Sequence, residues 1–252
     1  MYRTNPFRWW NIVAYAAVIT VNILSNALPL GGRSTKEISD QYYIYMTPAG
    51  YAFIIWSLIY VLLGGFVIYQ LRRDTGTRDS IHSIGIWFIL SCVFNMTWLF
   101  LWHNLYIEWS VIAMLLLVIS VGIIYRKTRR ITYPSTGEML LVRLPFSIYL
   151  GWISAAFLVN VGIVIHKNGW SPLGLTELGW SITLLCIGAV LAFLISYPTR
   201  DSILPLVFVW AYIAIAVEHK DVDNMLLTSF ILAAILFIYS IWLFFARNKA
   251  RD

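Results

Sequence analysis

Eight long apolar runs constrain what this chain can fold into. They cover residues 9–30, 48–71, 84–102, 109–125, 141–166, 179–197, 203–218 and 225–246. Most are close to the roughly 20 residues that a helix needs to cross a bilayer. Only 12% of the 252 residues are charged, which is about half the share found in soluble domains. We therefore predict an all-α fold, a polytopic transmembrane helix bundle with eight spans and no soluble domain.

Lysine and arginine gather in alternate loops between these runs. Fourteen of the 18 basic residues lie in the two termini or in the second, fourth and sixth loops. Because cytoplasmic loops carry the excess of positive charge in membrane proteins, both termini are predicted to be cytoplasmic. The strength of the bias favours a bacterial plasma membrane. The net charge of +6 then reflects topology and contact with lipid headgroups, and no nucleic-acid partner is expected.

The spans lack the charged groups that several classes of membrane protein require. All 12 acidic residues lie in loops or at helix ends, and no lysine lies in a helix core. Ion-coupled transporters usually carry such a group at mid-membrane, and a retinal protein needs a lysine there, so both classes are excluded. Cys92 and Cys186 stand alone, and the four histidines lie at helix ends without a paired motif. We expect no metal site, no acid–base pair and no catalytic residue.

Three spans carry large aromatic and amide side chains on single helical faces, at similar depth in the outer half of the bilayer. The candidate ligand-binding residues are Trp56, Tyr60, Asn95, Trp98, Tyr149, Trp152 and Asn160. With the polar first loop, residues 31–46, as a lid, this set is typical of a pocket for a flat apolar ligand. Helix packing is the open alternative, since an Asn in a span often bonds only a neighbouring helix. We interpret Asn22 and Asn26 in that way.

At these residues the chain resembles the TspO/MBR family of tryptophan-rich sensory or translocator proteins. The motifs that carry the resemblance are PAGYAFIIWSLIY from Pro48, NMTW from Asn95, and IYLGWISAAFLVN from Ile148. Two family prolines are replaced by Ile54 and Ile148, and a family Phe by Ala155. The family's cholesterol-recognition pattern is missing after the fifth span. The resemblance covers about residues 7–166.

The resemblance implies a five-helix core, residues 1–167, followed by three additional helices in residues 168–252. It also implies a cavity for a porphyrin or heme-type ligand, without a permanent cofactor, lined by the matched Trp and Asn residues. We therefore expect a binding or sensory protein; porphyrin breakdown, proposed for the family and disputed, is a further implication. Two alternatives stay open: facilitated transport of the ligand, and regulation of a partner. Residues 178–246 are the expected surface for a homodimer or a membrane-protein partner.

Overall fold

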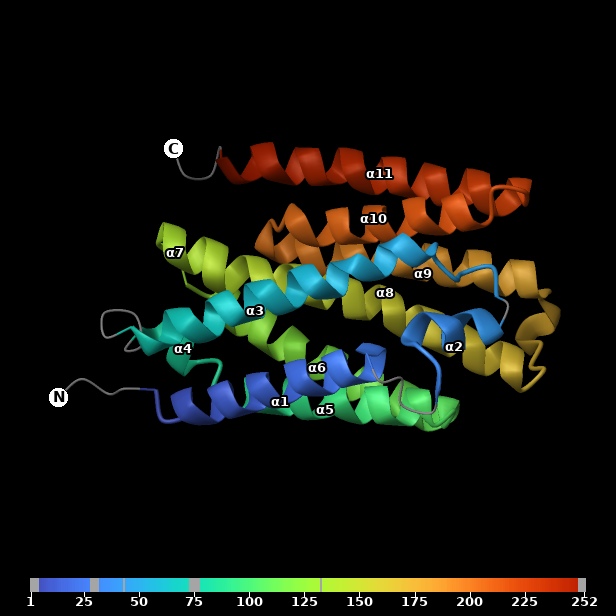
Figure 1. The fold of residues 1–252 in the computed structure, drawn as a ribbon. Coiled ribbons are helices and arrows are strands. Elements are labelled where there is room, and N and C mark those ends of the chain that lie inside the picture. The colour runs from blue at the N-terminus through green and yellow to red at the C-terminus, as the bar shows by residue number, and fades with distance from the viewer. Residues whose placement is uncertain (1–4, 28–31, 43, 73–77, 132, 249–252) are drawn as a thin grey trace. The chain divides into compact units, whose positions relative to one another are not determined.

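The computed structural model describes residues 5–27, 32–42, 44–72, 78–131 and 133–248. These residues form helices and turns, without any strand (Figure 1). Within the described residues, each predicted span overlaps a helix or a continuous run of helical segments. The chain divides into two compact units, one made of residues 1–35 and 55–150, the other of residues 36–54 and 151–252. The all-α prediction is confirmed.

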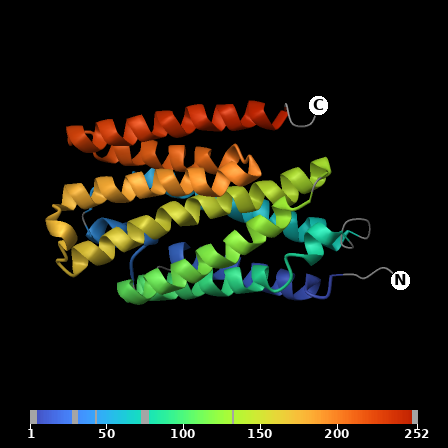
Figure 2. The same ribbon diagram turned by 180° about the vertical axis from the view of Figure 1, so that it is seen from behind.

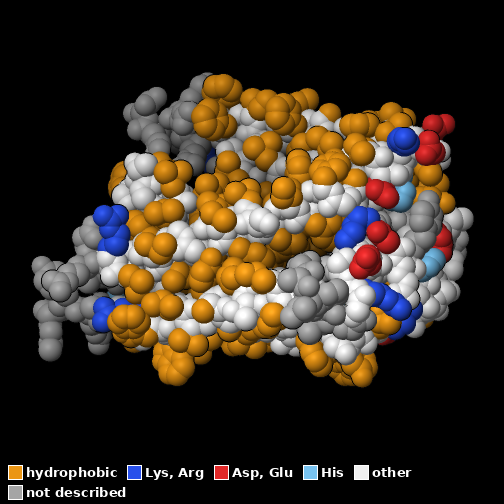
Figure 3. All heavy atoms as spheres, viewed as in Figure 1, with side chains coloured by type: hydrophobic (Ala, Val, Ile, Leu, Met, Phe, Trp, Pro, Cys, Tyr) orange, Lys and Arg blue, Asp and Glu red, His pale blue; other side chains and the backbone are white. Residues whose placement is uncertain are grey.

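Among the described residues, length and composition identify five helical runs that can cross a membrane. They are Gly50–Leu71, Ile107–Arg129, Thr136–Lys167, Glu177–Thr199 and Asp223–Ala246. Trp87–His103 and Ile203–Glu218 are shorter apolar helices. On the face shown in Figure 3, apolar side chains cover the middle of the helices and charged side chains gather near their ends. The chain is therefore an integral membrane protein; the full count of eight spans stays a prediction.

The first unit contains the N-terminal helices and the start of the fifth span. Its elements are α1 (Arg8–Ala27), α3 (Ile55–Leu71), α4 (Asp79–His82), α5 (Trp87–His103), α6 (Ile107–Arg129), α7 (Thr136–Glu138), the π-helical turn η3 (Met139–Arg143) and the first part of α8 (Leu144–Lys167). Helix α5 packs against α1 and α6, and α1 also packs against α3. In this unit α3, α5 and α8, which are separate in the sequence, meet at one group of aromatic side chains.

Three phenylalanines form the buried core of this unit. The ring of Phe66 lies 5.2 Å from that of Phe88 and 5.2 Å from that of Phe146, measured between centroids. All three side chains are fully buried. Edge-on and tilted contacts of this kind add about 0.5–1.5 kcal/mol per pair beyond area burial. They fix the rotation of α3, α5 and α8, and so the direction in which the candidate residues on these helices point.

The second unit contains the later helices and part of the first loop. Its elements are most of α2 (Thr35–Gln41), η2 (Gly50–Ile54), the rest of α8, η4 (Pro172–Gly174), α9 (Glu177–Ser196), η5 (Tyr197–Thr199), α10 (Ile203–Glu218) and α11 (Asp223–Asn248). Helices α9, α10 and α11 pack against one another (Figures 1 and 2). The boundary predicted between residues 167 and 168 separates the segment that resembles the five-helix family from the rest of the chain. The two compact units divide at a different place, within α8 after Leu150.

Candidate functional site

Asn95 lies at the centre of a hydrogen-bond network in the first unit. Its Oδ1 accepts a bond from Nδ2 of Asn22 at 3.0 Å and a longer one from Oη of Tyr60 at 3.5 Å. Its Nδ2 donates to Oη of Tyr149 at 3.2 Å. The Asn95 side chain is completely buried, and burying an amide is costly unless it is hydrogen-bonded. The network therefore gives both polar atoms of the Asn95 side chain hydrogen-bond partners, and it connects α1, α3, α5 and α8.

A row of aromatic rings lies beside this amide. Trp56 stacks on Tyr60, with centroids 5.7 Å apart and planes 17° apart, and on Trp98, at 6.2 Å and 26°. Trp98 stacks in turn on Trp102 at 5.8 Å and 27°. Tyr149 meets Trp56 edge-on at 6.1 Å. We call these five rings and Asn95 the aromatic–amide cluster.

The cluster offers stacking surfaces and neutral hydrogen-bonding groups. Its members are indoles, phenols and one amide, so no member carries a charge at neutral pH. Trp56 and Tyr60 are half-buried, whereas Trp98 and Tyr149 are buried. A flat molecule would therefore reach the row from the side of Trp56. This chemistry suits the binding of an apolar ring system.

The predicted site residues divide between the two units. Five of them, Trp56, Tyr60, Asn95, Trp98 and Tyr149, come together in the aromatic–amide cluster. Trp152 and Asn160 belong to the part of α8 in the second unit. There both are buried, and Trp152 meets the ring of Phe53 edge-on at 6.1 Å. Their membership in a common site stays a prediction.

Two cluster contacts were not predicted as parts of a site. Trp102 is not among the predicted site residues, yet it is buried, stacks on Trp98 and donates from Nε1 to the carbonyl of Thr35 at 3.2 Å. Its spacing of four residues from Trp98 was the available signal. Asn22 was expected to bond a neighbouring helix, and its bond to Asn95 confirms this. The side chain of Asn26 lies outside the described residues.

Comparison with known protein families shows which family the chain belongs to. A family described as TSPO-like protein matches residues 8–242. The chain belongs to the TSPO-like protein family. No curated protein and no solved structure matches it at a significant level.

The range of the family match bears on the three C-terminal helices. They were expected to lack a counterpart in the five-helix family that the motifs resemble. The TSPO-like match continues through α9 and α10 and into α11, as far as residue 242. The matched family region therefore includes α9, α10 and most of α11, as well as the segments that carry the aromatic–amide cluster.

Proposed function

We propose that this TSPO-like protein binds a tetrapyrrole or a similar flat hydrophobic molecule at the aromatic–amide cluster and acts as a membrane receptor for it. The observation that carries the proposal is the row of four stacked rings, Tyr60, Trp56, Trp98 and Trp102, next to a buried amide. A macrocycle has the same flat apolar shape as these rings. It would stack in the row in place of a ring–ring contact.

Binding requires the row to open, because its rings contact one another. Trp56 is half-buried and contacts Tyr60, Trp98 and Tyr149, so a movement of this one ring would open the row. The contact between Trp56 and Trp98 is stabilised by about 0.5–1.5 kcal/mol, which a macrocycle stacking on both indoles would recover. Asn95 would then supply a polar anchor.

The test is a titration of the detergent-solubilised protein with protoporphyrin IX, followed by the shift of the porphyrin absorption band. We expect saturable binding to the wild type. Trp98→Leu should weaken it by about tenfold, because a stacking surface is lost. Trp109→Leu is the matched control, since Trp109 is 63% exposed on the same unit, and it should bind like the wild type.

A second pair of variants separates a ligand anchor from a packing residue. Asn95→Leu and Asn22→Leu both remove the 3.0 Å bond between α1 and α5, but only Asn95→Leu removes the amide beside the rings. We expect Asn95→Leu to weaken binding by about tenfold, and Asn22→Leu to change it by less than about threefold. Equal losses in the two folded variants would show that the amide serves packing, and the site assignment would fail.

The location of the protein is part of the same proposal. We propose that it resides in a bacterial plasma membrane with both termini in the cytoplasm. The alternation of basic loops supports this orientation, with Arg126, Lys127, Arg129 and Arg130 at one end of α6 and the sparsely basic loops at the other ends of the helices. The aromatic–amide cluster would then lie nearer the outer surface.

A further inference from the structure

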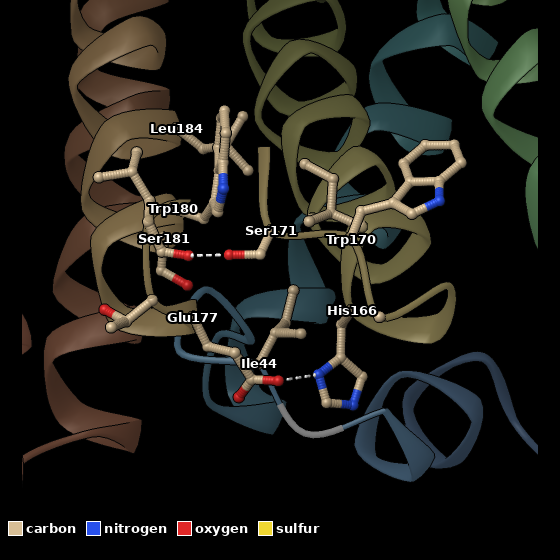
Figure 4. A pocket seen from close by; sticks show the side chains of 13 residues that line it. Ile44, His166, Trp170, Ser171, Glu177, Trp180, Ser181 and Leu184 are labelled. Atoms are coloured by element: carbon tan, nitrogen blue, oxygen red, sulfur yellow. Dashed lines mark hydrogen bonds and ion pairs between the residues drawn. The ribbon is translucent and has the colours of Figure 1, made fainter. Parts of the chain in front are cut away.

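A pocket in the second unit is lined by residues that do not belong to the aromatic–amide cluster. It is formed by Ile44 of the first loop, the last turns of α8, the connection to α9 and the first two turns of α9 (Figure 4). Its volume is about 280 Å³. Ligand sites for drug-sized molecules usually measure about 300–1,000 Å³, so this pocket would take a smaller molecule.

The lining of the pocket includes one carboxylate, that of Glu177. Nδ1 of His166 and Oε1 of Glu177 lie 2.6 Å apart at its rim, and the Glu177 side chain is 58% exposed. A carboxylate accepts up to about four hydrogen bonds, so pairing with His166 leaves capacity for another donor. Two nearby hydroxyls are already hydrogen-bonded to the backbone. Ser171 donates to the carbonyl of Leu175 at 2.9 Å, and Thr176 accepts from the amide of Gly179 at 3.2 Å.

The inner part of the pocket is apolar, and a glycine keeps it open. Gly162 of α8 faces Ile44 and Leu184 there. A Cβ at this position would lie 3.2 Å from Cδ1 of Ile44 and 3.4 Å from Cδ1 of Leu184. Any side chain would therefore fill this end of the pocket. The missing side chain leaves room for an apolar group of the ligand.

Two indoles complete the lining. Trp180 and Trp170 lie on either side of Ser171 in Figure 4. Indole faces attract organic cations through the negative potential of the ring face. The carboxylate of Glu177 would repel an anion, and among the described residues no Lys or Arg lines the pocket. The lining therefore combines one carboxylate and two indoles, which attract a cation, with apolar side chains that suit an apolar body.

We propose that this pocket binds a small organic ammonium ion with an apolar body. Its nitrogen would lie against Glu177, and its body would lie against the apolar side chains of the lining. The same chemistry occurs in free arylalkylamines and in choline-type lipid headgroups. The proposal does not depend on porphyrin binding, since it rests on other residues.

The experiment measures binding of phenethylammonium to the full-length protein in a sugar detergent, by calorimetry at pH 7.5. The matched probe is 3-phenylpropionate, which has a similar body and the opposite charge. We expect saturable binding of phenethylammonium only. Glu177→Gln should weaken it by about tenfold or more, through loss of a charged hydrogen bond. Asp223→Asn should leave it unchanged, because Asp223 is also a first-turn carboxylate, that of α11, but does not line the pocket.

Two further arms complete the test. Gly162→Leu should abolish phenethylammonium binding while the thermal unfolding midpoint and porphyrin binding stay measurable. Adding a short-chain phosphocholine lipid identifies the source: competition indicates a lipid headgroup, absence of competition a free amine, and both support the ammonium site. Equal or tighter binding of 3-phenylpropionate, binding unaffected by Glu177→Gln, or no saturable binding to the wild type would overturn the proposal.

Discussion

Gly188 shows how one missing side chain sets a helix contact in the second unit. A Cβ at this position of α9 would lie 2.5 Å from Oη of Tyr212 and 2.9 Å from Cδ1 of Leu158. The same Tyr212 hydroxyl donates to the carbonyl of Leu185 at 2.6 Å, and the Tyr212 side chain is 2% exposed. The glycine therefore lets a tyrosine of α10 reach the backbone of α9.

We expect Gly188→Ala to lower the free energy of unfolding by about 1–3 kcal/mol, because the added methyl group overpacks this contact. Gly122→Ala is the matched control in α6, where a Cβ would lie 3.9 Å from Cδ1 of Leu150, an ordinary contact. There the better helix propensity of alanine should raise the free energy of unfolding by up to about 1 kcal/mol. Unfolding titrations in sodium dodecyl sulfate measure both; a neutral Gly188→Ala would refute the packing account.

The segment that follows the predicted lid is held to α10. The amide of Ala49 donates to the carbonyl of Ala214 at 3.1 Å, and Nε1 of Trp210 donates to the carbonyl of Ala52 at 3.2 Å. Nε2 of His219 lies 3.1 Å from the carbonyl of Thr47. These bonds join residues more than 150 positions apart in sequence, so α10 determines where the end of the first loop lies within the second unit.

His219 makes this attachment sensitive to pH. The side chain lies just past the end of α10, where burial lowers its pKa from the ordinary value of 6.5; the Thr47 carbonyl and the Glu218 carboxylate oppose this shift only in part. The unfolded chain therefore binds the proton more readily than the folded one. The stability that neutral His219 contributes is fully present above pH 6.5 and is lost as the pH falls through the lowered pKa.

We therefore expect the thermal unfolding midpoint of the solubilised protein to fall between pH 7.5 and pH 5. His219→Gln should reduce that fall, because an amide donor can reach Thr47 without titrating. The difference between the two pH profiles isolates the histidine from the other titrating groups. Parallel profiles for the wild type and His219→Gln would contradict the assignment.

The membrane topology of the whole chain can be tested by labelling single cysteines. In a background without Cys92 and Cys186, single cysteines at Arg130 and Lys220 report on opposite sides of the proposed membrane. Both side chains are exposed. Lys220→Cys should react with an impermeant maleimide in intact cells, and Arg130→Cys only after the membrane is permeabilised. The reverse pattern would invert the orientation, and equal labelling of both in intact cells would refute the span count between them.

The amino-acid sequence by itself determined the helices and the faces on which their polar residues lie. Apolar runs of spanning length predict helices locally, because a backbone in lipid must satisfy its own hydrogen bonds. Spacing of three or four residues then places Asn95 with Trp98, and Trp56 with Tyr60, on common faces. The same local spacings carried the resemblance that the family match supports.

Only the tertiary structure decided which faces meet. The bond of Asn95 to Asn22, the burial of Trp102 and the attachment of the first loop to α10 depend on how each helix is rotated and how deeply it lies. The pocket at His166 and Glu177 also depends on the tertiary structure, because it needs Ile44 of the first loop to lie beside the connection between α8 and α9. Local sequence leaves these choices open, since helix rotation is set by side-chain packing against partners distant in the chain.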